Sequence, residues 1–329
     1  MTGKFIVSLD FELMWGVRYH MGRDDYGDAV LGGRQAIPEI LKLFSQYGVH
    51  ATWATVGLLF ARTRKEMLDY IPDDLPKYTN ASLSNYEAIQ GDIGENEKED
   101  PYHFGRSLLD LVAETPGQEV ATHTFSHFYC LEDGQTLSAF KADIQSAKAI
   151  AKSAGHELKS IVFPRNQYHD DHVEICVAEG ITTFRGQPDV FAYRTMANRD
   201  VTPLVRGVRL LDSIMPVVPR TDPRRPKQCA GATDVKASRF LRPWRSSLPA
   251  YSTLHLNRIR SEMRTAAQQG RQFHLWWHPH NFGRNARENL MQLEKVLEEY
   301  ARLRLSHGME SVTMSDAARE TQLVRGANC

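Results

Sequence analysis

Two histidines four residues apart follow a short strand-like pattern in the segment Val120-Ala-Thr-His-Thr-Phe-Ser-His127. A neutral imidazole nitrogen is a good ligand for a divalent cation, and a turn can bring positions i and i+4 to one ion. His123 and His127 therefore form a candidate half of a metal site. The same spacing recurs at His274 and His278, and chance produces about half of one such pair in a chain of this composition, so the spacing alone does not establish the site.

A hydrolytic metal centre usually adds a carboxylate ligand and keeps one position open for water. Asp10 and Glu12 stand directly after the apolar run from Phe5 to Leu9. Such a run is typical of a buried parallel strand, and chemistry in barrels gathers at the carboxyl ends of strands. Side chains two positions apart in a strand point the same way, so either carboxylate could reach the ion.

Two further strand ends carry polar side chains. Arg165 and Asn166 follow the strand expected at 159–164, and His278, His280 and Asn281 follow the one expected at 272–277. If these strands are parallel, their carboxyl ends surround one pocket together with the acids and the first histidine pair. A plain structural turn is the alternative for the segment 278–281.

Tryptophans are the candidate surfaces for a sugar ring. Trp53, Trp276 and Trp277 lie on expected strands, and an indole can stack on a pyranose. Tryptophan on a strand belongs to the core more often than to a binding site, so this alternative stays open.

Strand and helix patterns alternate along the chain, which predicts a parallel sheet with helical crossovers. We expect a distorted, seven-stranded (β/α) barrel with outer helices, formed by a single domain at 1–322 and followed by a tail at 323–329. An open doubly wound sheet is the alternative, but no glycine-rich G-x-G-x-x-G motif follows any strand. The expected strands are 5–9, 50–56, 119–123, 159–164, 180–185, 272–277 and 310–314, and the expected helices are 32–48, 58–70, 104–114, 137–154, 173–178, 252–269, 288–305 and one from 316.

Two stretches interrupt the alternation and are expected as insertions at about 71–103 and 219–250. The first is rich in turn residues and charges, which indicates a solvated loop or a lid. The second contains many prolines and basic residues without periodicity. It is expected to be a flexible loop, or alternatively a clamp for an anionic group of a substrate. Its basic residues are Arg220, Arg224, Arg225, Lys227, Lys236, Arg239 and Arg242.

Composition gives no sign of a polyanionic or membrane partner. Forty basic residues balance forty acidic ones, and 42% of the residues are hydrophobic. Binding to nucleic acid is therefore not expected, and no apolar run is long enough to predict a transmembrane segment. The first residues contain no secretion signal pattern, so a cytoplasmic location is expected. The four cysteines are far apart in sequence and are expected to remain reduced.

The motifs, taken in order, resemble those of the NodB-type polysaccharide deacetylases, carbohydrate esterase family four. The closest motif match is His123-Thr-Phe-Ser-His127, which corresponds to the family's His-Ser/Thr-x-x-His. Asp10-Phe-Glu12 is similar to the family's paired acids, and Trp276-Trp-His-Pro-His-Asn281 to its late histidine motif. Phe163-Pro-Arg-Asn-Gln167 is similar to the third motif with proline and arginine in swapped order. The resemblance extends from Lys4 to Met314.

The resemblance implies one divalent metal ion held by Glu12, His123 and His127, with Asp10 as general base. Zinc is the expected ion, and manganese, cobalt, iron and nickel fit the same ligands. The other implied roles are Arg165 as the partner that keeps Asp10 ionised, His278 as general acid with His280 as its competitor, and His280, Asn281, Asn166, Trp53 and Trp277 as substrate contacts.

The resemblance further implies hydrolysis of an N-acetyl or N-formyl group from an amino sugar, in the assembly of bacterial surface polysaccharide. The partner would be a glycan or an amino sugar, nucleotide-linked or lipid-linked. Two alternatives stay open: a small-molecule amidase or ureide hydrolase of the same fold, and a glycan-binding protein that has lost catalysis.

Overall fold

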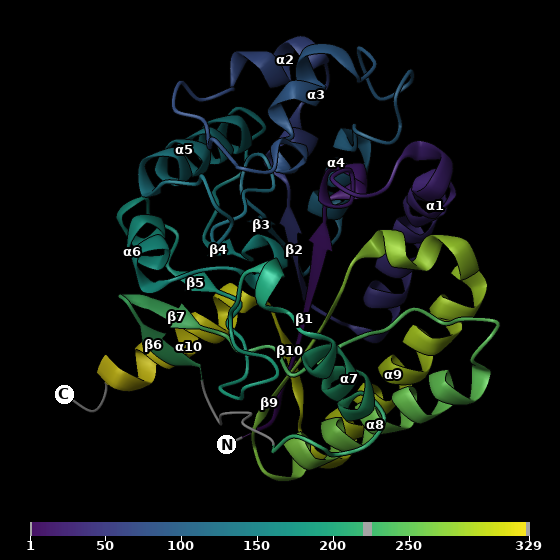
Figure 1. The fold of residues 1–329 in the computed structure, drawn as a ribbon. Coiled ribbons are helices and arrows are strands. Elements are labelled where there is room, and N and C mark those ends of the chain that lie inside the picture. The colour runs from purple at the N-terminus through teal and green to yellow at the C-terminus, as the bar shows by residue number, and fades with distance from the viewer. Residues whose placement is uncertain (1, 220–225, 327–329) are drawn as a thin grey trace.

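A curved, mostly parallel sheet lies at the centre of the computed structural model, which describes residues 2–219 and 226–326. The strands are β1 (Lys4–Phe11), β2 (Ala51–Thr55), β3 (Gln118–Thr122), β4 (Ser160–Ile161), β5 (Thr183–Phe184), β6 (Lys227–Cys229), β7 (Ala232–Asp234), β8 (Arg239–Phe240), β9 (Gln272–Trp277) and β10 (Glu310–Val312). Their order is β6-β7-β5-β4-β3-β2-β1-β9-β8, with β10 also paired to β1. Only the β6–β7 pair is antiparallel, so the prediction of parallel strands with outer helices is confirmed (Figure 1).

The two edges of this sheet are joined by one continuous segment. β7 pairs with β5, and β8, which follows after four residues, pairs with β9. Between them, the amide of Val235 donates to the carbonyl of Phe184, and the amide of Ser238 donates to the carbonyl of His274. The segment 232–240 thereby closes the sheet into a distorted (β/α) barrel in which β7 and β8 share one strand position.

The closing strand differs from the sequence expectation. Residues 219–250 were expected as an irregular loop and 310–314 as the seventh strand. Instead, 232–240 completes the barrel, whereas β10 pairs with residues 4–6 of β1, beyond the start of β2. This strand lacks an apolar pattern in the sequence, because its polar residues have partners inside the protein: Arg239 forms buried ion pairs with Asp212 and Glu262. Residues 220–225, with three of the expected clamp arginines, lie outside the described residues.

Helices pack around the barrel: α1 (Arg23–Tyr47), α2 (Arg64–Asp69), α3 (Tyr86–Gly91), α4 (Arg106–Glu114), α5 (Leu137–Ser153), α6 (Asp170–Ala178), α7 (Pro203–Asp212), α8 (Pro249–Gln268), α9 (Ala286–His307) and α10 (Met314–Gly326). Most expected helices are present with shifted bounds. Gly48 ends α1 with a left-handed φ of 65°, as the sequence indicated. The helix expected at 58–70 is instead a 3-10 turn, Gly57–Phe60, followed by α2. Helix α7 was not expected, and the expected tail begins inside α10, with 327–329 outside the described residues.

The segment 71–103 lies beyond the carboxyl end of β1, above the barrel in Figure 1, together with α2 and α3. It is folded onto the molecule, because Tyr86 and Ile89 of α3 are buried in the main hydrophobic core. Tyr86 also donates a hydrogen bond to buried Asp143 on α5, at 2.9 Å. The segment therefore supports structure near the strand ends.

Apolar side chains fill part of the barrel interior, including its amino end. They form one buried cluster: Ile6, Ala54, Val162, Val235, Val312, Met314 and Ala317. Because β10 pairs with the first residues of β1, α10 begins at this end and inserts Met314 and Ala317 into the cluster. The barrel is thus packed at its amino end.

None of the described helices combines the length and apolar character needed to cross a bilayer. Cys130, Cys176 and Cys229 are free thiols, in agreement with the expectation of reduced cysteines. Cys329 lies outside the described residues.

Removing the Met314 side chain should destabilise the barrel. We expect Met314→Ala to lower the free energy of unfolding by about 2–5 kcal/mol, because it opens a cavity among fully buried apolar groups. Denaturant titration of the variant measures this loss. Leu305→Ala is the control, since Leu305 on α9 is 85% exposed; an equal loss in both variants would contradict the packing argument.

Candidate metal centre and active site

Three side chains converge where the strands end. Glu12 follows β1, and His123 and His127 follow β3. The Nε2 atoms of His123 and His127 lie 3.3 Å and 3.0 Å from Oε2 of Glu12. All three residues are buried, and their ligand atoms lie within 4.8 Å of one another. A carboxylate oxygen and two imidazole nitrogens in one small volume fit zinc, manganese, cobalt, iron or nickel.

Unusual backbone conformations bring these ligands together. Thr124 and His127 have φ values of 63° and 62°, and Leu13, next to Glu12, has a φ of 47°. Residues other than glycine rarely adopt this left-handed region, which costs of order 1–3 kcal/mol each. The surrounding structure therefore has to hold the turn in place.

Asp143 on α5 provides much of that support. Its carboxylate accepts hydrogen bonds from the amides of Phe125 and Ser126, at 2.6 and 3.1 Å, and from the hydroxyl of Tyr86. Burial raises the pKa of Asp143 to about 6, although these hydrogen bonds oppose the shift. Nothing in the sequence marked this residue, because its partners lie on other elements of the chain.

A second contact fixes the orientation of His123. Its Nδ1 lies 2.7 Å from the carbonyl oxygen of Val162, so Nδ1 carries the proton and Nε2 presents its lone pair toward Glu12. This is the tautomer that metal ligation through Nε2 requires. The geometry supports the fit of an ion between Glu12 and the two histidines.

Asp10 has a different set of partners. Its two carboxylate oxygens accept hydrogen bonds from Nη1 and Nη2 of Arg185, at 2.6 and 2.8 Å. Burial alone would raise the pKa of Asp10, but the Arg185 guanidinium, together with His278 and His123, offsets it and the pKa is lowered. Both oxygens are thus held by the guanidinium, and Glu12 is the carboxylate placed among the histidines.

The expected partnership between Arg165 and Asp10 is wrong. Arg165 has a left-handed φ of 53°, and its guanidinium lies over the rings of Tyr19 and Tyr129 and 3.5 Å from a carboxylate oxygen of Glu132. The swapped order of proline and arginine moves this side chain away from the acid. The next residue, Asn166, reaches the pair instead.

Arg185 was missed by the sequence analysis although the same rule would have found it. It stands directly after β5, at a strand end of the kind that drew attention to Arg165. Its guanidinium also donates to Ser8 Oγ at 3.1 Å and to Asn166 Oδ1 at 3.0 Å. Arg185 is fully buried, so its charge is compensated by Asp10 rather than by water.

The late histidines differ in their access to solvent. His278 Nε2 lies 3.6 Å from Asp10 and 3.7 Å from Glu12, and its side chain is 23% exposed. His280 Nε2 lies 3.8 Å from Glu12, with only 4% of its side chain exposed. The side-chain amide of Asn281 lies 3.2 Å from His278 Nδ1. His278 is therefore the better placed to meet a substrate.

The expected tryptophan contacts are also corrected. Trp53 and Trp277 are fully buried and pack against Phe44 on the outer side of the barrel wall. Both are paired in register with Leu9, whose side chain points away from the interior. Trp276 faces the inside instead, where the Arg185 guanidinium lies 4.1 Å from its ring centroid. The twofold alternation of strands explains the difference.

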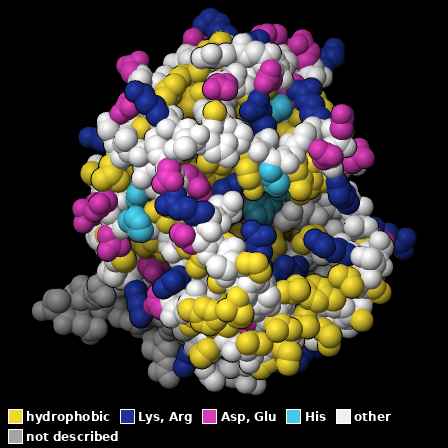
Figure 2. Space-filling view, viewed as in Figure 1, with side chains coloured by type: hydrophobic (Ala, Val, Ile, Leu, Met, Phe, Trp, Pro, Cys, Tyr) yellow, Lys and Arg dark blue, Asp and Glu magenta, His cyan; other side chains and the backbone are white. Residues whose placement is uncertain are grey.

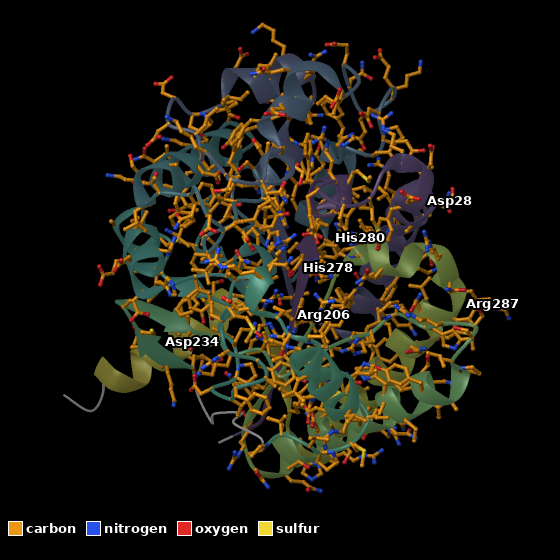
Figure 3. The ribbon with its side chains drawn as sticks, in the orientation of Figure 1. Asp28, Arg206, Asp234, His278, His280 and Arg287 are labelled. Atoms are coloured by element: carbon orange, nitrogen blue, oxygen red, sulfur yellow. The ribbon has the colours of Figure 1, made fainter. Side chains whose placement is uncertain are left out.

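The face of the molecule above the strand ends is hollowed near its centre, and histidine side chains are visible in the hollow (Figure 2). His278 and His280 lie next to each other there (Figure 3), with ring centroids 5.2 Å apart. The candidate centre is therefore reached from this face.

Residues 24–184 match the sequence model of the polysaccharide deacetylase family. This segment, 161 of the 329 residues, is similar to the polysaccharide deacetylases. The matched segment contains His123 and His127, whereas Asp10, Glu12, Arg185 and His278 lie outside it. The structure, not the family match, brings these residues to the histidine pair.

Solved structures share the fold at low sequence identity. A protein described as a polysaccharide deacetylase from Mycobacterium smegmatis has a TM-score of 0.55 and 13% identity, over 99% of this chain and 92% of that one. Another from Pseudomonas aeruginosa PAO1 has a TM-score of 0.53 and 11% identity, over 96% and 89%. A GH57-type branching enzyme from Pyrococcus horikoshii has a TM-score of 0.51 and 14% identity, over 96% and 70%. No curated protein matches the sequence.

A methyl group at Gly16 should disturb the metal site. A Cβ atom at this position would overlap the carboxylate of Glu12. We expect Gly16→Ala to displace Glu12 and to weaken zinc binding by about 10- to 100-fold, measured by calorimetry. Gly207→Ala on α7 is the matched control, because a Cβ there meets nothing within 4 Å. Equal zinc affinity in all three proteins would contradict the assignment of Glu12.

Replacing Arg185 should change the pH dependence of catalysis. In Arg185→Gln, burial is no longer offset by the guanidinium, so the pKa of Asp10 rises and this carboxylate, the expected general base, is protonated at higher pH. We expect the acidic limb of kcat/KM to move to higher pH, with a loss of about 10²-fold at neutral pH. Arg165→Gln should leave the position of that limb unchanged, since Arg165 does not pair with Asp10; a shift in both variants would argue against the assigned pair.

Proposed function

We propose that the protein is a divalent-metal-dependent hydrolase that removes an N-acetyl or N-formyl group from an amino sugar. The match of residues 24–184 to the polysaccharide deacetylase family supports deacetylation of a carbohydrate. The observation that carries the finer proposal is the Glu12, His123 and His127 cluster with an ionised Asp10 and a solvent-reaching His278 beside it. A bound divalent ion would supply Lewis-acid activation of water and of the acyl carbonyl.

The chain's own residues have separate roles in this proposal. Asp10, kept ionised by Arg185, accepts a proton from the attacking water. His278 lies across from Asp10 and donates a proton to the departing nitrogen. Amide hydrolysis needs this proton, because an unprotonated amine is a poor leaving group. The Asn281 amide beside His278 Nδ1 holds the ring in place. Asp10 and His278 thereby divide base and acid catalysis between two strand ends.

The substrate in this proposal is an amino sugar used in the assembly of bacterial surface polysaccharide. The exposed edge of the His278 ring and the inward-facing Trp276 form a partly aromatic wall, with ring centroids 5.8 Å apart. Such a wall suits the apolar face of a sugar ring. The acyl group would enter first, toward Glu12 and the histidines.

The test is release of acetate or formate by purified protein supplied with zinc, manganese or cobalt. The substrates are N-acetyl and N-formyl amino sugars, with O-acetyl sugars and small amides as comparison. We expect release from the N-acyl sugars and a loss of about 10²-fold or more in His123→Ala, because one metal ligand is removed. His307→Ala on α9 is the control, since His307 is exposed.

Several results would reject the proposal. Unchanged acid release by His123→Ala would show that the metal centre does not take part in the reaction. Hydrolysis of small amides alone would indicate an amidase, and saturable sugar binding without turnover would indicate a glycan-binding protein.

A further inference from the structure

A cavity of about 480 Å³ adjoins the candidate active site. Asn166 and Trp276 line it, and both also contact the guanidinium of Arg185. Phe240 is on the same wall, and its ring centroid lies 5.7 Å from that of His278. A molecule bound in the cavity would therefore touch residues that border the reacting groups.

Positive charge dominates the lining of this cavity. No acidic residue of the described chain lines it. The basic side chains along its wall are Arg165, Arg194, Arg206, Arg209, Arg239 and Arg242. Basic side chains are also visible along the lower border of the hollow in Figure 2.

Only part of this charge is neutralised within the protein. Arg239 is paired with Asp212 and Glu262, and Arg165 has a longer contact with Glu132. No carboxylate of the described residues pairs with the other four arginines. The buried Nη2 atom of Arg165 also has no hydrogen-bond partner among the described residues. The cavity thus holds donors that the chain itself does not satisfy.

Arg209 and Arg242 are the central pair. Nη2 of Arg242 donates to the main-chain carbonyl of Arg209 at 3.4 Å, so the two residues are neighbours although they are far apart in sequence. Burial, together with the nearby positive charge of Arg242, lowers the pKa of Arg209. Two neighbouring guanidinium groups without a counter-ion repel each other, and an anion between them would relieve this repulsion.

We propose that this cavity binds a phosphate or diphosphate group attached to the amino sugar. The inference rests on the proposed function for the sugar, and it adds the class of substrate. Guanidinium groups bind phosphate oxygens through paired N–H donors, and arginines from separate elements can surround several such oxygens. Arg206 and Arg209 come from α7, whereas Arg242 follows β8. A diphosphate could accept hydrogen bonds from the arginines of α7 and from Arg242 at the same time.

The carrier of the phosphate has two possible sources. Helix α7 also exposes apolar side chains to solvent, with Leu204 at 71% exposure, and Leu211 and Met215 are exposed beside it. Figure 2 shows a broad hydrophobic area below the basic border, over α7 and α8. A lipid phosphate could lie along this area, whereas a nucleotide would stay within the cavity. The phosphate chemistry is common to both sources, and the experiment separates them.

The first measurement is binding of inorganic pyrophosphate by calorimetry. Chelator-treated protein is used, so that pyrophosphate cannot bind through a metal ion. We expect binding that weakens with added salt and falls at least 10-fold in the double variant Arg209→Gln with Arg242→Gln. Arg287→Gln, an exposed arginine on α9 at the far right of Figure 3, is the control and should bind as the wild type does.

The second measurement identifies the carrier. UDP-N-acetylglucosamine in solution is compared with polyprenyl-phosphate-linked N-acetylglucosamine in phosphatidylcholine vesicles, each in competition with pyrophosphate. Displacement by either one supports the phosphate subsite and names its source. Displacement by neither would overturn the proposal.

The failure of each idea can be recognised separately. If wild type does not bind pyrophosphate, or if the double variant binds it equally well, the phosphate subsite is rejected whatever the deacylation assays show. If pyrophosphate binds as expected but no acid is released from any sugar, the proposed function fails and the anion site stands. Melting curves of the double variant verify that it is folded.

Discussion

The ion pair between Asp10 and Arg185 connects parts of the barrel that are distant within the sheet. Three strands separate β1 from β5 in the sheet order, so the arginine reaches across the interior to the acid. Its guanidinium also contacts Ser8 and Asn166, and His274 on β9 contacts Ser8 at 2.8 Å. Removing one partner of a buried pair leaves an uncompensated charge, which costs about 3–5 kcal/mol. The ends of β1, β4 and β5 thereby depend on the ion pair between Asp10 and Arg185.

That pair also separates the functions of two carboxylates that stand two residues apart. Asp10 and Glu12 begin as equivalent candidates, because both side chains leave β1 on the same side. Arg185 engages both oxygens of Asp10, whereas Glu12 extends to the two histidines. The same short motif thus provides one carboxylate held by a permanent cation and a second carboxylate directed at the two histidines. The left-handed Leu13 that follows turns the chain away at once.

The rule that chemistry lies at the carboxyl ends of parallel strands predicted that Asp10, Glu12, His123, His127 and His278 lie together, and the structure brings them together. It worked because strand periodicity and strand order in the chain are visible in sequence. The identity of the arginine was missed because local backbone geometry at Arg165 and Asn166, not residue type, decides which side chain turns inward. The closing segment 232–240 was missed because its polar residues are satisfied by distant partners. Asp143 left no local signal, since its hydrogen-bond donors are main-chain amides and hydroxyls of other elements.

The packed amino end of the barrel has a consequence for the order of events at the site. Ile6, Val312 and Met314 pack together at that end, so under the proposed function the acyl group would enter and leave by the opposite face. A substrate that enters acyl group first places its sugar between the small acid product and the solvent. In that proposal the deacylated sugar would have to depart, or at least move aside, before acetate or formate could escape. Turnover would follow a last-in, first-out sequence, and the free acid would be the product that inhibits by occupying the innermost position.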